Sequence, residues 1–225
     1  MLYLITFAAS LPALVLLDPV LNDASYIVGP GADTRVILAG VLELFTAAAG
    51  VGTAIVLFPV VKRQSEVLAL GFVAARTVEA AMIVVNVVAY LAVVTLRQPD
   101  ATGPDAAVLV TAGRALIAIH DWAVLLGQGT IPAVNALLLG TLIYRSGLVP
   151  RVIPALGLAG APLLLGAVIA VMFGVFDRFS VWAVIALAPI FVWELSLGLW
   201  LAVKGFRPSP VTAARVDANP RQVEA

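Results

Sequence analysis

The sequence predicts an all-α protein: a polytopic bundle of six transmembrane helices, with a broken or re-entrant segment before the fourth crossing. The first observation is composition, because 62% of the 225 residues are hydrophobic, 12% are charged and the mean hydropathy is +1.09. Soluble domains carry about 25% charged residues. The second observation is that long apolar runs recur along the whole chain. The third is that turn residues and Lys/Arg-bearing loops separate these runs.

The first apolar run covers residues 1–17, and an acidic, turn-rich loop is predicted over residues 18–34. The run lacks the basic flank and the small-residue cleavage site of a signal peptide, so we interpret it as a transmembrane helix. Its length is at the short limit for a span, and we expect the natural start to lie further upstream. The second span covers residues 36–61, ends before a Lys-Arg pair and contains a single charge, Glu43.

The third span covers residues 67–96 and carries several polar side chains on one face. Arg76, Glu79, Asn86 and Tyr90 follow one another at spacings of three, seven and four, which helical periodicity places on the same side. A charge at the centre of a bilayer costs about 2.5–3.5 kcal/mol on insertion scales, so such side chains must be paired or must line a polar cavity. This face therefore predicts polar neighbours inside the bundle.

Residues 106–144 are too long for one simple crossing, because a helical rise of about 58 Å exceeds a hydrocarbon core of about 30 Å. A Gly-Gln-Gly triplet centred on Gln128, followed by Pro132, marks the expected break. We interpret residues 106–122 as a re-entrant or surface-lying half. Residues 123–144 are then the fourth crossing.

The same segment carries a polar residue at every seventh position. Seven residues are close to two helical turns, so these side chains are predicted to line one stripe of a helix. They are Arg114, Asp121, Gln128 and Asn135. The only histidine, His120, precedes Asp121. The two form either a proton-transfer pair or an anchoring cluster at the membrane interface.

The last two spans are predicted over residues 152–173 and 181–203. The fifth span is rich in small residues, which permit close helix packing. The sixth contains one acid, Glu194. Residues 1–206 are expected to form a single transmembrane domain, and residues 207–225 are polar enough to predict a disordered cytoplasmic tail.

Lysine and arginine residues in the short loops predict the orientation of the spans. The residues assigned to the cytoplasmic side are Lys62, Arg63, Arg145, Arg151, Lys204, Arg207, Arg215 and Arg221. The aspartate-rich loops then fall outside. Six spans with both termini in the cytoplasm satisfy this rule, whereas seven spans would place the arginine-rich tail outside.

Several segments resemble a known family. They are YIVGPGADTRVILAGVLELF, VAARTVEA, IHDWAVLLGQG, LLLGTLIYRSGLVPRVIPALGLAGAPLLL and FVWELSLGLWLAVKGF. Together they resemble the bacterial membrane family known as domain of unknown function 4386, over essentially the whole chain up to Phe206. Such proteins usually carry a basic segment before the first span, which this sequence lacks. The resemblance implies a multi-pass protein of the bacterial cytoplasmic membrane and implies no activity.

Ten residues make up the predicted intramembrane polar cluster. They are Glu43, Arg76, Glu79, Asn86, Arg114, His120, Asp121, Gln128, Asn135 and Glu194. Helical rise places most of them in the outer half of the membrane, so we expect a pocket that opens to the outside. Glu43, Arg76 and Glu79 are expected to be connected, with Asp121 or Gln128 facing them. Glu43 is the surplus acid, which must find an arginine or hold a proton.

Three function classes remain open. A small-solute or proton-linked binding or transport protein would use the polar pocket. A structural or regulatory membrane protein would use the same charges only for helix packing. A membrane-embedded enzyme acting on lipid is the third class, and it is disfavoured because the spacing reveals no activated nucleophile.

The composition also limits cofactors and partners. The chain has no cysteine and one histidine, so we expect no metal site, no cofactor and no catalytic thiol. The net charge is zero, which gives no reason to expect nucleic acid as a partner. The lipid bilayer is the expected partner, together with a small molecule or a proton. The sequence does not predict an oligomeric state.

Overall fold

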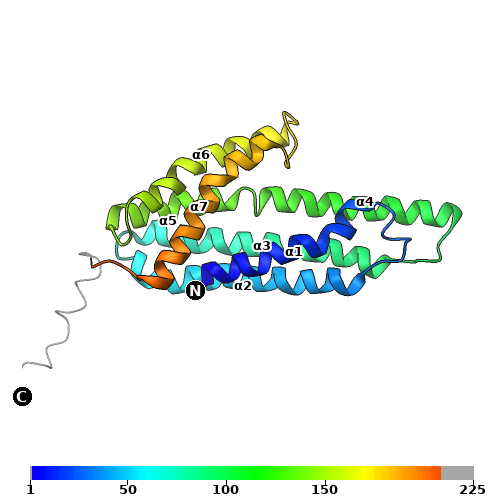
Figure 1. Cartoon of the computed structure of the whole chain (residues 1–225), viewed down its shortest axis with the longest axis horizontal. Coiled ribbons are helices and arrows are strands. Elements are labelled where there is room, and N and C mark those ends of the chain that lie inside the picture. The colour runs from blue at the N-terminus through cyan, green and yellow to red at the C-terminus, as the bar shows by residue number, and fades with distance from the viewer. Residues whose placement is uncertain (1, 209–225) are drawn as a thin grey trace, which may run out of the picture. The chain divides into compact units, whose positions relative to one another are not determined.

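The computed structural model describes residues 2–208, which form seven helices and no strand (Figure 1). The helices are α1 (Leu2–Asn22), α2 (Asp33–Val61), α3 (Glu66–Leu96), α4 (Gly103–Leu126), α5 (Ile131–Ser146), α6 (Val152–Met172) and α7 (Val181–Val203). Six helical segments are long and apolar enough to cross a membrane, with α4 and α5 together counting as one. The predicted all-α fold with six spans is confirmed. Apart from its first two residues, the predicted tail lies outside the described residues.

The first helix ends later than predicted. It continues through Pro19 to Asn22, so the loop begins at Asp23 and the prediction of a loop from Asp18 was wrong. The Asn22 amide donates a hydrogen bond to Asp18 Oδ1 at 2.8 Å across one helical turn. This i,i+4 bond supports the last turn of α1 despite its turn-forming residues.

The turn between α4 and α5 confirms the predicted departure from a straight helix. Gly127 adopts φ −85° and ψ −84°, and the Gly129 N–H donates to the Val124 carbonyl at 2.8 Å, five residues back. A Cβ on Gly127 would lie 2.4 Å from Met82 Cβ. A Cβ on Gly129 would lie 2.5 Å from the Leu125 carbonyl oxygen. Both positions therefore need glycine, which lets the turn pack directly against α3 and against the end of α4.

This turn moves the division of the long segment and interrupts its polar stripe. Helix α4 continues past Trp122 to Leu126, so the predicted division after Trp122 was too early. Arg114 and Asp121 lie in α4, whereas Gln128 lies in the turn. The prediction of one continuous helical stripe was wrong beyond Asp121, because the glycines redirect the backbone. A re-entrant or surface-lying position for the first half stays a prediction.

The described chain separates into two compact units, each with its own core. Unit 1 contains Gly52–Arg76 together with the chain from Pro132 onward. Unit 2 contains Leu2–Val51 and Thr77–Ile131. Helices α2 and α3 therefore contribute one part to each unit.

Unit 2 packs α1 against the first part of α2, the second part of α3 and α4. Its core consists of Ala13, Leu17, Val20, Tyr26, Ile27, Val36, Ala39, Ala47, Ile83, Val87, Tyr90 and Val93. Arg97 joins the end of α3 to the start of α2 by donating to Asp33 Oδ2 at 2.6 Å and to the Gly29 carbonyl at 2.7 Å. The Tyr26 hydroxyl donates to Asp33 Oδ1 at 3.0 Å. Burial, aided by Asp33, raises the pKa of Tyr26 to about 12, so this phenol remains a donor.

In unit 1, α6 and α7 form an antiparallel hairpin (Figure 1). The two helices approach each other closely at glycines of α6. A Cβ on Gly157 would lie 2.5 Å from Trp193 Cδ2, and a Cβ on Gly160 would lie 2.7 Å from Pro189 Cβ. The small residues of the fifth span therefore serve packing, because they make room for a fully buried tryptophan.

Candidate functional site

Five polar side chains of unit 2 gather between helices α2, α3 and α4 and the turn that follows α4. They are Glu43 on α2, Asn86 and Tyr90 on α3, His120 on α4 and Gln128 in the turn after α4. We call them the Glu43 cluster. Four of the five residues are no more than 5% exposed, and Gln128 is half-buried. Polar groups at this depth must find partners within the protein or in bound molecules.

Gln128 links α2 and α3. Its Nε2 donates to Glu43 Oε2 at 3.0 Å, and its Oε1 accepts from Asn86 Nδ2 at 3.4 Å. Within unit 2, the bond from Gln128 is the only side-chain hydrogen bond to Glu43, and no ion pair involves its carboxyl. A neutral amide satisfies one lone pair but supplies no positive charge. The carboxyl is therefore buried beside amides without a paired Lys or Arg from its own unit.

Two polar atoms of the cluster have no hydrogen-bond partner within the described residues. They are Asn86 Oδ1 and the Tyr90 hydroxyl. Tyr90 lies one helical turn after Asn86 and within electrostatic range of Glu43. An amide oxygen only accepts, whereas a phenol both donates and accepts. A buried polar group without a hydrogen bond costs about 1–3 kcal/mol. A bound polar molecule that donates to Asn86 Oδ1 and forms a hydrogen bond with the Tyr90 hydroxyl would remove this cost.

His120 connects the Glu43 cluster to the protein surface. Its ring packs edge-to-face on Tyr90 with 5.9 Å between centroids, and the imidazole lies within electrostatic range of Glu43. His120 Nδ1 lies 3.0 Å from Asp121 Oδ1. Because an ionised carboxylate only accepts, Nδ1 carries the hydrogen and donates it. The His120 side chain is 6% exposed and that of Asp121 is 40% exposed, so the pair joins a buried site to an accessible one.

Asp121 also lines an open cavity of about 240 Å³, which we call the Arg114 cavity. Its lining comes from α1, the loop after it, α3 and α4. The lining residues are Val20, Leu21, Asn22, Asp23, Ala24, Tyr26, Ile27, Val93, Gly113, Arg114, Ile117, Ala118 and Asp121. Ser25 donates to Asp23 Oδ1 from its hydroxyl at 2.6 Å and from its backbone N–H at 2.8 Å. These two bonds lower the pKa of Asp23, which keeps the rim of the cavity negatively charged.

The remaining predicted site residues lie elsewhere. Arg76 donates to Glu194 Oε1 at 2.8 Å, which joins α3 to α7 inside unit 1. Asn135 is fully buried in α5, also in unit 1, and Glu79 is buried on the part of α3 that belongs to unit 2. Because Arg76 and Glu43 belong to different units, their predicted connection stays a prediction.

Sequence reasoning misses two features of these sites. Tyr90 is not among the ten predicted site residues, although it shares a face with Asn86 at i+4 spacing, which is the signal for its place in the Glu43 cluster. The pairing of Arg76 with Glu194 has no local signal, because the two residues are far apart in the sequence and on different helices. Within the described residues, no group of three or more His, Asp or Glu side chains is arranged to hold a metal ion.

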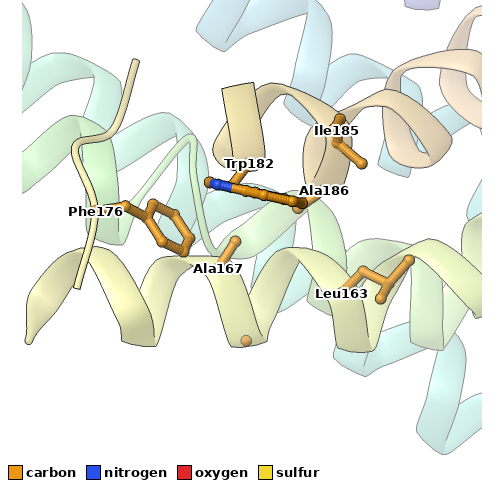
Figure 2. A pocket seen from close by; sticks show the side chains of 7 residues that line it. Leu163, Ala167, Phe176, Trp182, Ile185 and Ala186 are labelled. Carbon is orange, nitrogen blue, oxygen red and sulfur yellow. The ribbon is translucent and has the colours of Figure 1, made fainter. Parts of the chain in front are cut away.

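A second depression lies between α6 and α7 and is almost entirely apolar. It has a volume of about 510 Å³ and is lined by Leu163, Gly166, Ala167, Phe176, Trp182, Ile185 and Ala186. Figure 2 shows the indole of Trp182 edge-on above Ala167, with the ring of Phe176 beside it. This depression offers hydrophobic contact but no hydrogen-bonding side chain apart from the indole of Trp182.

The long apolar helices with polar side chains buried between them define a multi-pass integral membrane protein. The chain belongs to the family described as Domain of unknown function (DUF4386), whose model matches residues 1–205. The family resemblance seen in the sequence is therefore confirmed. No curated protein and no solved structure matches the chain.

Proposed function

We propose that this protein binds or transports a small solute in a proton-linked manner, with the Glu43 cluster as its proton site. The observation that supports this proposal is the environment of Glu43, which is a buried carboxyl whose hydrogen-bond partner is a neutral amide. A carboxyl in this setting is stabilised by taking up a proton or by a positively charged guest. The unsatisfied atoms of Asn86 and Tyr90 provide adjoining positions for water or a polar group.

His120 and Asp121 supply a route between this site and water. Histidine is the side chain whose proton exchanges most readily near neutral pH, and Asp121 holds its ring in one orientation. A proton bound at His120 Nε2 gives an imidazolium whose Nδ1–H stays bonded to Asp121, and its transfer from Nε2 to the Glu43 carboxylate leaves the neutral ring. The alternative role for intramembrane charges, helix packing alone, is supported in unit 1, where Arg76 and Glu194 form an ion pair.

We propose that the protein lies in a bacterial cytoplasmic membrane with both termini in the cytoplasm. Single cysteines at Ser65 and Pro208 should then stay unlabelled by an impermeant thiol reagent in intact cells, whereas Thr102→Cys should react. The cysteine-free chain makes the background low. Ser146, beside Arg145, is not a suitable labelling position, because it is only 8% exposed and would be shielded from the reagent on either side of the membrane. Labelling of Pro208→Cys from outside would contradict this topology, and permeabilised cells provide the positive control.

The proton site is tested by its reactivity toward dicyclohexylcarbodiimide, an apolar reagent that attacks protonated carboxyls in hydrophobic surroundings. We expect mass spectrometry to find the adduct on Glu43 of the full-length protein in lipid nanodiscs. Glu194 is the internal control, because an ion-paired carboxylate should remain unmodified. A water-soluble carbodiimide should modify only exposed acids. Modification of Glu194 with Glu43 untouched would contradict the proposed function.

A further inference from the structure

The Arg114 cavity has the size and the charge pattern of a binding site for a small solute. Its volume is about 240 Å³, which is room for a small solute together with water molecules. Val20, Ile27, Val93 and Ile117 provide an apolar wall for a short aliphatic body.

The charges of the cavity are separated along α4. Arg114 and Asp121 are seven residues apart on one face of the helix, a rise of about 10.5 Å. Arg114 is exposed, and within the described part of the chain no hydrogen bond or ion pair to another side chain engages its guanidinium. A guanidinium without a protein partner can bind a solute carboxylate through two parallel hydrogen bonds. Asp121 and Asp23 supply carboxylates that accept from an ammonium group.

We propose that the Arg114 cavity binds short zwitterions of the amino-acid class, with the solute carboxylate on Arg114 and its ammonium on Asp121 and Asp23. A simple anion of this size would meet two carboxylates, and a simple cation would meet the guanidinium. Only a solute with opposite charges at its two ends satisfies both. The inference rests on the proposed function, for which it names the solute class.

The bond between Asp121 and His120 couples this cavity to the Glu43 cluster. An ammonium group on Asp121 competes with His120 Nδ1–H for the same carboxylate. The groups that face His120 are Asp121 on its own helix, Tyr90 on α3 and Glu43 on α2. When Asp121 turns to the solute, the imidazole loses its anionic partner. Solute binding thereby releases the His120 ring from the carboxylate that orients it beside Tyr90 and Glu43.

Isothermal titration calorimetry on the full-length protein in nanodiscs tests the solute class. The probes are β-alanine, 4-aminobutyrate and 5-aminopentanoate, whose charges lie further apart than those of an α-amino acid, compared at equal ionic strength with propionate and ethylamine, which each carry one of the two charges. We expect saturable binding of at least one zwitterion and none of the single-charge probes. Arg114→Gln and Asp121→Asn should each weaken binding at least tenfold. Asp23→Asn should weaken it less, because Asp23 is exposed at the rim and Asp121 still accepts from the ammonium group.

The matched controls are Arg35→Gln and Asp105→Asn, which remove the same charges from exposed positions outside the cavity. They should leave affinity unchanged. The proposal is overturned if no zwitterion binds, if propionate or ethylamine binds as tightly, or if Arg114→Gln retains full affinity. If carbodiimide labels Glu43 but no zwitterion binds, the proposed solute class is wrong and the proton site at Glu43 stands. If a zwitterion binds but Glu43 is not labelled, the proposed proton site is wrong.

Discussion

Replacing Arg76 with methionine should lower the free energy of unfolding by about 3–5 kcal/mol, the largest effect expected of any single change considered. The substitution leaves the Glu194 carboxylate inside unit 1 without its guanidinium, 2.8 Å away in the native protein. Methionine keeps most of the volume of the side chain, so the loss reports on charge rather than on a cavity. Unfolding by denaturant in detergent micelles measures the change, and Arg35→Met on an exposed position is the matched control.

The double substitution Arg76→Met with Glu194→Leu tests whether the loss of stability comes from leaving the Glu194 carboxylate without its ion-pair partner. Removing both charges should recover much of the lost stability, because neither group is then left buried alone. Additive losses in the double variant would contradict the pairing. A loss below about 1 kcal/mol in the single variant would place this pair among weak surface pairs.

Replacing Gly127 with alanine should lower the free energy of unfolding by about 1–3 kcal/mol, the range for overpacking. The new Cβ would lie 2.4 Å from Met82 Cβ and 2.8 Å from the Ala123 carbonyl oxygen, and neither atom can move independently of the backbone. The turn must therefore shift. Gln128 lies in this turn and would move with it. Because Gln128 donates to Glu43, carbodiimide labelling of Glu43 should change as well. Thermal unfolding followed by tryptophan fluorescence measures the stability change.

Gly50→Ala is the control for this substitution, because a Cβ there meets no atom within 4 Å. Alanine in an open helical position stabilises by about 0.5–1 kcal/mol, so the two changes should have opposite signs. Met82→Ala should not rescue Gly127→Ala, since alanine keeps the Cβ that causes the clash. Equal effects at both glycines would contradict the close approach of the turn to α3.

The spans and the break could be predicted because each follows from local chemistry. Apolar length alone indicates a transmembrane helix, and the glycines around Gln128 indicate where a helix longer than the bilayer must change direction. The end of α1 could not be placed, because the Asn22–Asp18 bond outweighs the turn preference of Pro19.

The partners of the polar residues could not be predicted for a different physical reason. Periodicity shows which residues share a face but not which helix that face meets. It placed Arg76 on a polar face, yet Glu194 on α7 is the partner seen in unit 1. It placed Gln128 on a helical stripe, whereas the glycine turn takes this residue out of the helix and against Glu43. Tertiary packing determines these contacts, and the local pattern of a single sequence does not show which helices pack together.

Infrared spectroscopy of the Glu43 carboxyl tests the central claim most directly, because it observes the proton itself. The difference spectrum between the wild type and Glu43→Gln in nanodiscs should contain the carbonyl stretch of a protonated carboxylic acid. That band should shift in D₂O and convert to carboxylate bands as the pH rises. Gln128→Leu, which removes the hydrogen bond to Glu43, should move the band without abolishing it. A difference spectrum with carboxylate bands alone at every pH would contradict a proton site at Glu43.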